Sequence, residues 1–180
     1  MQRVWRALRG RGGYTMVELL AVLTIFLIVV TSLTTLFVTG AKAELDANRR
    51  FQAQLSARVA FDQMRREIHC GSALTFTSAS SVSITLPPGC PSAAGVQTTV
   101  VYDTASAGTN RYTLRRKLGA AAAVPIADYL TSGNVFAYTA PSTDALGRLS
   151  VDMPVNVYPN EAWKTWRLVA DIVLRNTTRE

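Results

Sequence analysis

The chain has 180 residues, of which 48% are hydrophobic, and its 19 basic and 12 acidic residues give a formal net charge of +7. It holds a single histidine, so a Ser-His-Asp catalytic set could be built only around His69, and no glycine-rich loop of the kind that binds phosphate is present. We therefore predict a protein that is not an enzyme and that needs no cofactor or metal.

The first element in chain order is a basic leader followed by a long apolar run. Four arginines and no acidic residue come before Glu18, and Leu19–Val38 then supplies twenty residues without a charge. A helix of twenty residues spans about 30 Å, the thickness of a bilayer core. The positive charges ahead of the run predict a single membrane pass with the N-terminus in the cytoplasm and the residues after about 40 outside. The four arginines are Arg3, Arg6, Arg9 and Arg11.

Glu18 lies at the head of this run, where a carboxylate costs a few kcal/mol unless a cation pairs with it. We interpret it as a functional residue. A secretory signal peptide is an alternative, with Ala41-Lys42-Ala43 as its cleavage site and Glu44 as the new N-terminus, and a plain membrane anchor is another. Against secretion, the run is longer than the usual 7–15 residues of a signal peptide, and a glutamate beside Gly-Gly has no role in that pathway.

The residues Gly13-Tyr14-Thr15-Met16-Val17-Glu18-Leu19-Leu20 resemble the processing site of type IV prepilins and type II secretion pseudopilins. The resemblance covers about the first thirty residues, and Tyr14 stands where phenylalanine is commoner. It implies that a prepilin peptidase cuts between Gly13 and Tyr14 on the cytoplasmic side and then N-methylates Tyr14. It also implies that Glu18 pairs with the N-terminal ammonium of an adjacent subunit when the helices assemble into a filament.

The same resemblance implies the partners and the location. The partners are the prepilin peptidase, an assembly platform protein, and other major and minor pilins or pseudopilins. The protein would first lie in the bacterial inner membrane and then in an extracytoplasmic filament.

Cleavage would also change the charge. It removes the four leader arginines, which leaves 15 basic against 12 acidic residues and a net charge of +3. We therefore do not interpret the high charge as nucleic-acid binding. Nucleic acid would be a partner only in a competence pilus, where a basic surface cluster could contribute. The simpler interpretation is that this cluster is the solvated edge of a strand and loop. The cluster is Arg111, Arg115, Arg116 and Lys117.

From Gly40 to about Gly71 the composition stays helical and contains no proline, which predicts an amphipathic continuation of the helix. At 100° per residue the apolar positions form two groups, which suit one contact with the protein's own sheet and one with a neighbouring subunit. A single core-facing stripe with scatter is an equal alternative. One group is Leu45, Phe51, Leu55 and Val59, and the other is Ala53, Ala57, Phe61, Met64 and Ile68.

Beyond Gly71 the period shifts to alternation, with β-branched and aromatic residues between turn signals. These segments predict a β-rich head, in which Trp166–Leu174 is apolar enough to pack on the helix. Gly119–Val124, mostly alanine, is expected to be a short helix or a loop. The predicted strands are about 73–77, 80–86, 97–103, 111–117, 134–139, 148–157 and 165–175.

The two cysteines, Cys70 and Cys90, both fall on the outer side of the membrane, where disulfides form and persist. A bridge would tie the first hairpin to the helix end. Two alternatives stay open, namely two free thiols or a metal site that adds His69. Five further acids are scattered singly, and calcium binding by some of them, as in certain pseudopilin loops, is an alternative. None has ligand-like spacing, so we expect solvated turn residues. They are Asp103, Asp128, Asp144, Asp152 and Asp171.

Together these features predict an α+β pilin fold, with a long N-terminal helix packed on an antiparallel sheet. The predicted parts are a leader (1–13), a membrane and filament-core helix (14–40), an amphipathic continuation (41–71) and the head (72–180). Residues Arg58–Ile68 resemble the helix end of J-type minor pseudopilins and W-type minor pilins. We expect a minor subunit of a type IV pilus or type II secretion pseudopilus, in a tip or priming complex. The alternatives are an anchored ligand-binding domain that does not polymerise, and an extracytoplasmic enzyme, which would need a pocket with convergent polar groups.

Overall fold

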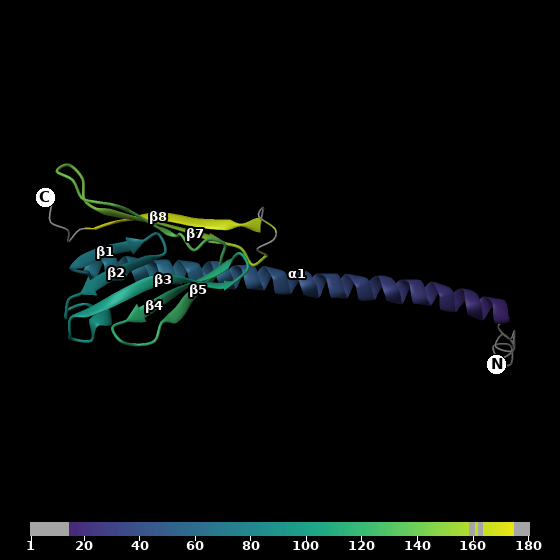
Figure 1. Ribbon diagram of the computed structural model, residues 1–180. Helices are drawn as coiled ribbons and strands as arrows, with labels where there is room; N and C mark the ends of the chain where they lie inside the picture. Colours follow the sequence, from purple (N-terminus) through teal and green to yellow (C-terminus); the bar gives the residue numbers. More distant parts are fainter. Residues whose placement is uncertain (1–14, 159–160, 162–163, 175–180) are drawn as a thin grey trace, which may run out of the picture. The chain divides into compact units, whose positions relative to one another are not determined.

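A computed structural model describes residues 15–158, 161 and 164–174 (Figure 1). In these residues it contains one long helix, α1 (Met16–Cys70), a short 3₁₀ helix, η1 (Pro91–Ala93), and eight strands. The chain divides into two compact units, Met1–Asp46 and Ala47–Glu180, so α1 contributes to both. The predicted processing residues Gly13 and Tyr14 lie outside the described residues.

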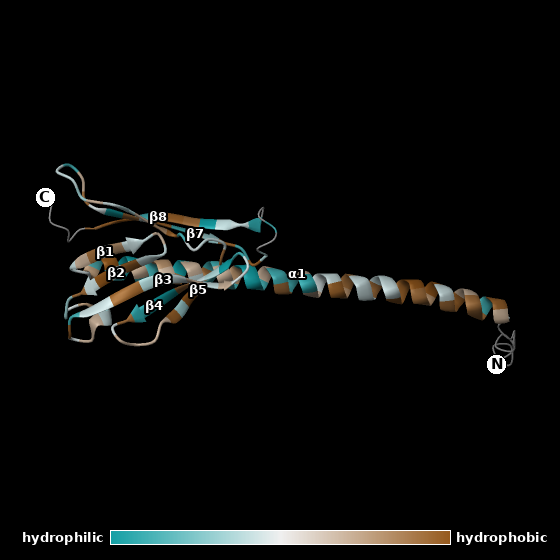
Figure 2. Ribbon diagram, in the orientation of Figure 1, coloured by the Kyte–Doolittle hydropathy of each residue, from teal (hydrophilic) through white to brown (hydrophobic). Residues whose placement is uncertain are grey.

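In the first unit, Leu19–Val38 of α1 carries no charged residue, and Figure 2 draws much of this part of the helix in brown. α1 is the one helix of the described chain that is long and apolar enough to cross a membrane, judged by length and composition. The hydroxyl groups of five threonines donate to carbonyl oxygens three or four residues earlier, which satisfies them within the helix itself. These threonines are Thr24, Thr31, Thr34, Thr35 and Thr39.

In the second unit, an antiparallel sheet curls around the remaining part of α1 (Figure 1). The strands follow the order β1-β2-β3-β4-β5-β7-β6, and β8 also pairs with β7. The strands are β1 (Ala73–Ser78), β2 (Ser81–Leu86), β3 (Thr98–Gly108), β4 (Arg111–Leu118), β5 (Val124–Leu130), β6 (Phe136–Thr139), β7 (Arg148–Val155) and β8 (Trp166–Val173). The predicted α+β class, with one long helix packed on an antiparallel sheet, is confirmed.

The core lies between α1 and the inner face of this sheet. Small side chains on the helix, such as the fully buried Ala57, let the strands approach it closely, and Met64 fills the space between them. The helix ends at Cys70, and the next residue must be glycine because a Cβ atom at Gly71 would lie 2.6 Å from Cγ2 of Ile84 in β2. The largest fully buried side chains on the strands are Val82, Ile84, Leu86, Val100, Tyr102, Leu114, Leu130, Leu149, Met153 and Ile172.

Seven of the strands occur where alternation predicts them, but β5 does not follow that signal. The sequence interpretation placed no strand at Val124–Leu130, which contains a proline and an aspartate that disfavour strands. In the structure β5 pairs with β4 through a register with two irregularities, and Tyr129 adopts a φ of 62°. Tertiary pairing therefore overrides local preference here. The preceding residues 119–123 form a turn and loop, which was one of the two expectations for them.

Candidate functional site

Glu18 sits in the first turn of α1 and is exposed in the first unit. Its backbone N–H donates to Thr15, to the carbonyl oxygen at 3.0 Å and to Oγ1 at 3.3 Å. A threonine at the helix start followed three residues later by glutamate is the pattern of a capping box. Glu18 can therefore serve the helix start as well as carry a charge, and any test of its role must separate these two effects.

The second-unit part of α1 has two apolar faces. Ala53, Ala57 and Met64 are buried against the sheet, whereas Phe51, Leu55 and Val59 are 63%, 48% and 55% exposed. The exposed three stand four residues apart and so form one line along the helix, which we call the outer stripe. This burial favours the two-face interpretation over a single stripe with scatter.

The predicted disulfide between Cys70 and Cys90 is present, and it joins the end of α1 to the start of η1. Both sulfurs are consumed by the bridge, so neither is a thiolate that could bind a metal. The part of the chain that the structure describes also holds no group of three His, Cys, Asp or Glu side chains placed to hold a metal ion. The two alternatives, a metal site with His69 and a pair of free thiols, therefore do not fit.

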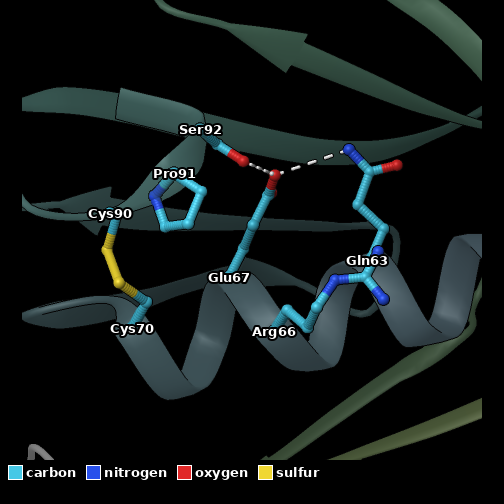
Figure 3. Close-up of a pocket in the computed structure, with 7 residues that line it drawn as sticks. All are labelled: Gln63, Arg66, Glu67, Cys70, Cys90, Pro91 and Ser92. Carbon is cyan, nitrogen blue, oxygen red and sulfur yellow. Dashed lines mark hydrogen bonds between the residues drawn. A yellow bond between two sulfur atoms is a disulfide. The ribbon is translucent and has the colours of Figure 1, made fainter. Parts of the chain in front are cut away.

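Next to the disulfide, Glu67 of α1 is 4% exposed and accepts hydrogen bonds from two strands and the 3₁₀ helix of the head. Arg116 of β4 donates to it from Nη2 at 2.6 Å, Tyr102 of β3 donates from its hydroxyl at 2.6 Å, and Ser92 of η1 donates at 2.7 Å. Gln63, one helical turn earlier, adds a longer bond at 3.4 Å. We call these five residues the Glu67 cluster; Figure 3 shows three of them, Glu67, Ser92 and Gln63.

The electrostatics of the cluster favour an ionised carboxylate. Burial raises the pKa of Glu67, but the hydrogen bonds from Arg116, Tyr102 and Ser92 outweigh burial, and the pKa ends below its ordinary value. Burial and the Glu67 carboxylate together raise the pKa of Tyr102, which keeps its phenol protonated as a donor. Sequence reasoning missed this cluster, although Glu67 stands three residues after the buried Met64 and seven after the buried Ala60 on the core side of α1.

A pocket of about 290 Å³ opens beside the disulfide and the Glu67 cluster (Figure 3). Its lining includes Arg66 and Pro91 in addition to the two cysteines and Glu67. The carboxylate in this lining is already bound by Arg116, Tyr102 and Ser92. A group so engaged is poorly placed to act as a general base. The arrangement instead works as a clamp that fixes the end of α1 to η1, β3 and β4.

We expect the disulfide to stabilise the head by about 3 kcal/mol, since a bridge across a separation of 20 residues restricts the unfolded chain. The double variant Cys70→Ala/Cys90→Ala should lower the free energy of unfolding by that amount in a urea titration of the detergent-solubilised chain. A reducing agent should lower the midpoint of the natural chain and leave that of the variant unchanged. An equal midpoint for variant and natural chain would show that the bridge adds nothing.

The cationic cluster predicted on β4 is largely neutralised in the structure. Arg116 binds Glu67, while Arg111 binds Asp128 and Arg115 binds Asp103. This arrangement does not provide the free basic patch that nucleic-acid binding needs.

Four of the five acids expected to be solvated turn residues lie on strands and form ion pairs, so that expectation is wrong for them. Their pairs join neighbouring strands, which sequence spacing does not reveal. They are Asp103 with Arg115, Asp128 with Arg111, Asp152 with Arg167, and Asp171 with Arg148.

Comparison with known proteins identifies one matching region. Residues 8–34 match the family model described as the prokaryotic N-terminal methylation motif. This region contains Glu18 and most of the apolar run. No curated protein and no solved structure matches the chain significantly.

Proposed function

We propose that this chain is a minor pilin or pseudopilin that assembles through its N-terminal helix, and its match to the prokaryotic N-terminal methylation motif supports this proposal. The motif at residues 8–34 is the observation that carries this proposal. It fits the membrane-length apolar helix and the head of the α+β pilin class. The activity proposed is assembly, and the proposed position is a tip or priming complex.

Assembly would begin with cleavage between Gly13 and Tyr14, which leaves an α-ammonium on Tyr14. Residues four apart share a helix face, so this ammonium and Glu18 would present opposite charges at the same end of the helix. In the proposed filament, Glu18 of one subunit pairs with the ammonium of the next. The pairing offsets the cost of holding either charge alone in an apolar environment, and it sets the axial register between subunits.

The second unit also carries an exposed apolar surface, the outer stripe. Phe51, Leu55 and Val59 leave a large apolar surface on a helix whose opposite face is already buried. Such a surface is a common mark of a protein interface. The disulfide and the Glu67 cluster support the same function, because they tie the end of α1 to the sheet and so transmit a pull on the helix to the head.

We expect the mature protein to begin at N-methyl-Tyr14 in cells that contain a prepilin peptidase. Mass spectrometry and N-terminal sequencing of the membrane-extracted chain measure this directly. Gly13→Leu should block cleavage, because glycine lets the backbone approach the protease closely. Cells without the peptidase provide the control and should yield the chain from Met1.

Two results would contradict the filament function. A Met1 start in the presence of the peptidase would leave a single-pass anchored domain that binds an unknown ligand. A start at Glu44 would indicate ordinary secretion.

A further inference from the structure

β8 has an unpaired edge in the described part of the chain, where it pairs with β7 alone. The ladder fixes which backbone groups face that edge. The N–H of Leu174 donates to the carbonyl oxygen of Gly147 at 2.8 Å, and the pairing continues in register through Arg148 opposite Val173. Bonded and non-bonded pairs alternate in an antiparallel ladder. The residues of β8 at the non-bonded pairs therefore direct both their N–H and their C=O groups toward the free edge. These residues are Arg167, Val169, Asp171 and Val173.

Proteins usually protect such an edge with charged side chains, proline, bulges or short length. β8 has eight residues and no proline. Its two charged residues form ion pairs with β7: Arg167 pairs with Asp152, and Asp171 pairs with Arg148. The edge therefore offers backbone hydrogen bonds, and both of its charged side chains are paired with opposite charges on β7.

The first residue of β8 contacts α1 beside the outer stripe. The guanidinium of Arg58 lies over the ring of Trp166, the first residue of β8, at 5.5 Å from the ring centroid. Leu55 stands three residues before Arg58 on the helix, and Val59 follows it directly. Both side chains are about half exposed. A strand added to β8 would lie about 4.8 Å beyond it, and its alternate side chains would lie on the same sheet face as Trp166, which Arg58 of α1 covers.

The same helix surface is positively charged. Arg58, Arg65 and Arg66 are exposed there with a single exposed acid, Asp62, among them. In the described residues no ion pair engages these three arginines. A second copy that added its own β8 would bring the same arginines to this surface, and like charges would oppose it. An acidic partner would be attracted.

From these features we propose that the β8 edge and the outer stripe bind an extended strand of another protein, in which apolar residues alternate with acidic or neutral polar ones. Backbone bonds to β8 supply affinity, and the apolar and acidic side chains supply selectivity. This inference goes beyond the filament function, because an anchored domain that never polymerises could use the same edge.

A peptide of the length of β8 that alternates valine with glutamate and threonine is the probe, and fluorescence anisotropy with the full chain in detergent is the measurement. Val169→Pro removes one outward N–H and leaves the bonds to β7 in place, so it should weaken binding about tenfold or more. Val169→Thr keeps the N–H and is the matched control, with less than a twofold effect. Hydrogen exchange should show new protection at Arg167, Val169 and Asp171 when the peptide binds.

Several outcomes would overturn the proposal. These are no binding to the folded chain, equal binding of a peptide with lysine in place of glutamate, or no difference between Val169→Pro and Val169→Thr. Self-association of the chain that Val169→Pro abolishes would assign the edge to a second copy instead. Glu18→Ala should leave peptide binding unchanged, so a failure of the filament function can be told apart from a failure of this one.

Discussion

Replacing Glu67 with leucine is expected to destabilise the head by about 3–5 kcal/mol, the usual cost of removing one partner from a buried ion pair. The variant would leave Arg116, whose side chain is 16% exposed, without its carboxylate, and would leave the Tyr102 hydroxyl without an acceptor. Domains of this size are stable by only about 5–15 kcal/mol. Urea unfolding of the full chain, followed by tryptophan fluorescence, measures the loss.

Two controls show whether the loss comes from the buried charge. Asp171→Asn breaks the exposed pair with Arg148, and it should cost less than about 1 kcal/mol. The double variant Glu67→Leu/Arg116→Leu removes both charges and should recover part of the stability that Glu67→Leu loses. If Glu67→Leu and Asp171→Asn cost the same, the Glu67 cluster is not a special source of stability.

The same cluster should make the head sensitive to acid. The folded-state pKa of Glu67 is below its ordinary value near 4.5. Its contribution is therefore complete above that ordinary value and is lost as the pH falls through the folded pKa. The free energy of unfolding should decline below about pH 5 in the natural chain, and the decline should be shallower in Glu67→Gln.

Local patterns in the sequence predict much of this fold. The apolar run, the two faces of the second half of α1, and seven strands depend on the spacing of neighbouring residues, which is visible in one chain. The disulfide was also predictable, because two cysteines on the outer side of a membrane permit a single pairing. The disulfide is thus the one part of the clamp at the end of α1 that the sequence predicts.

The features that sequence reasoning missed depend on long-range pairing. Glu67 and Arg116 are 49 residues apart, and no local pattern links them. β5 forms because β4 pairs with it, despite Pro125 and Asp128 in its own sequence. The free edge of β8 likewise follows from strand order, since alternation alone predicts a strand but does not say whether it lies at the edge or the centre of a sheet.

Glu18→Ala should strongly reduce incorporation into filaments while the head still folds. A carboxylate and an ammonium that meet in an apolar environment together gain a few kcal/mol over either charge alone, and each 1.4 kcal/mol is a factor of ten. We therefore expect a drop of about a hundredfold in the chain recovered from sheared filaments. Immunoblotting of the filament and membrane fractions measures it, and formation of the Cys70–Cys90 disulfide reports that the head is folded.

Glu18→Gln separates the two roles that the structure allows for this residue. Glutamine can take the place of glutamate in a capping box, so it keeps the contribution to the helix start at Thr15 and removes the charge. If Glu18 acts by pairing with the ammonium of another subunit, Gln and Ala should fail equally. If Gln restores assembly, the residue works by capping the helix. Unchanged membrane retention together with unchanged capture of partner pilins in Glu18→Ala would count against a filament role, because the charge would then contribute nothing to association between subunits.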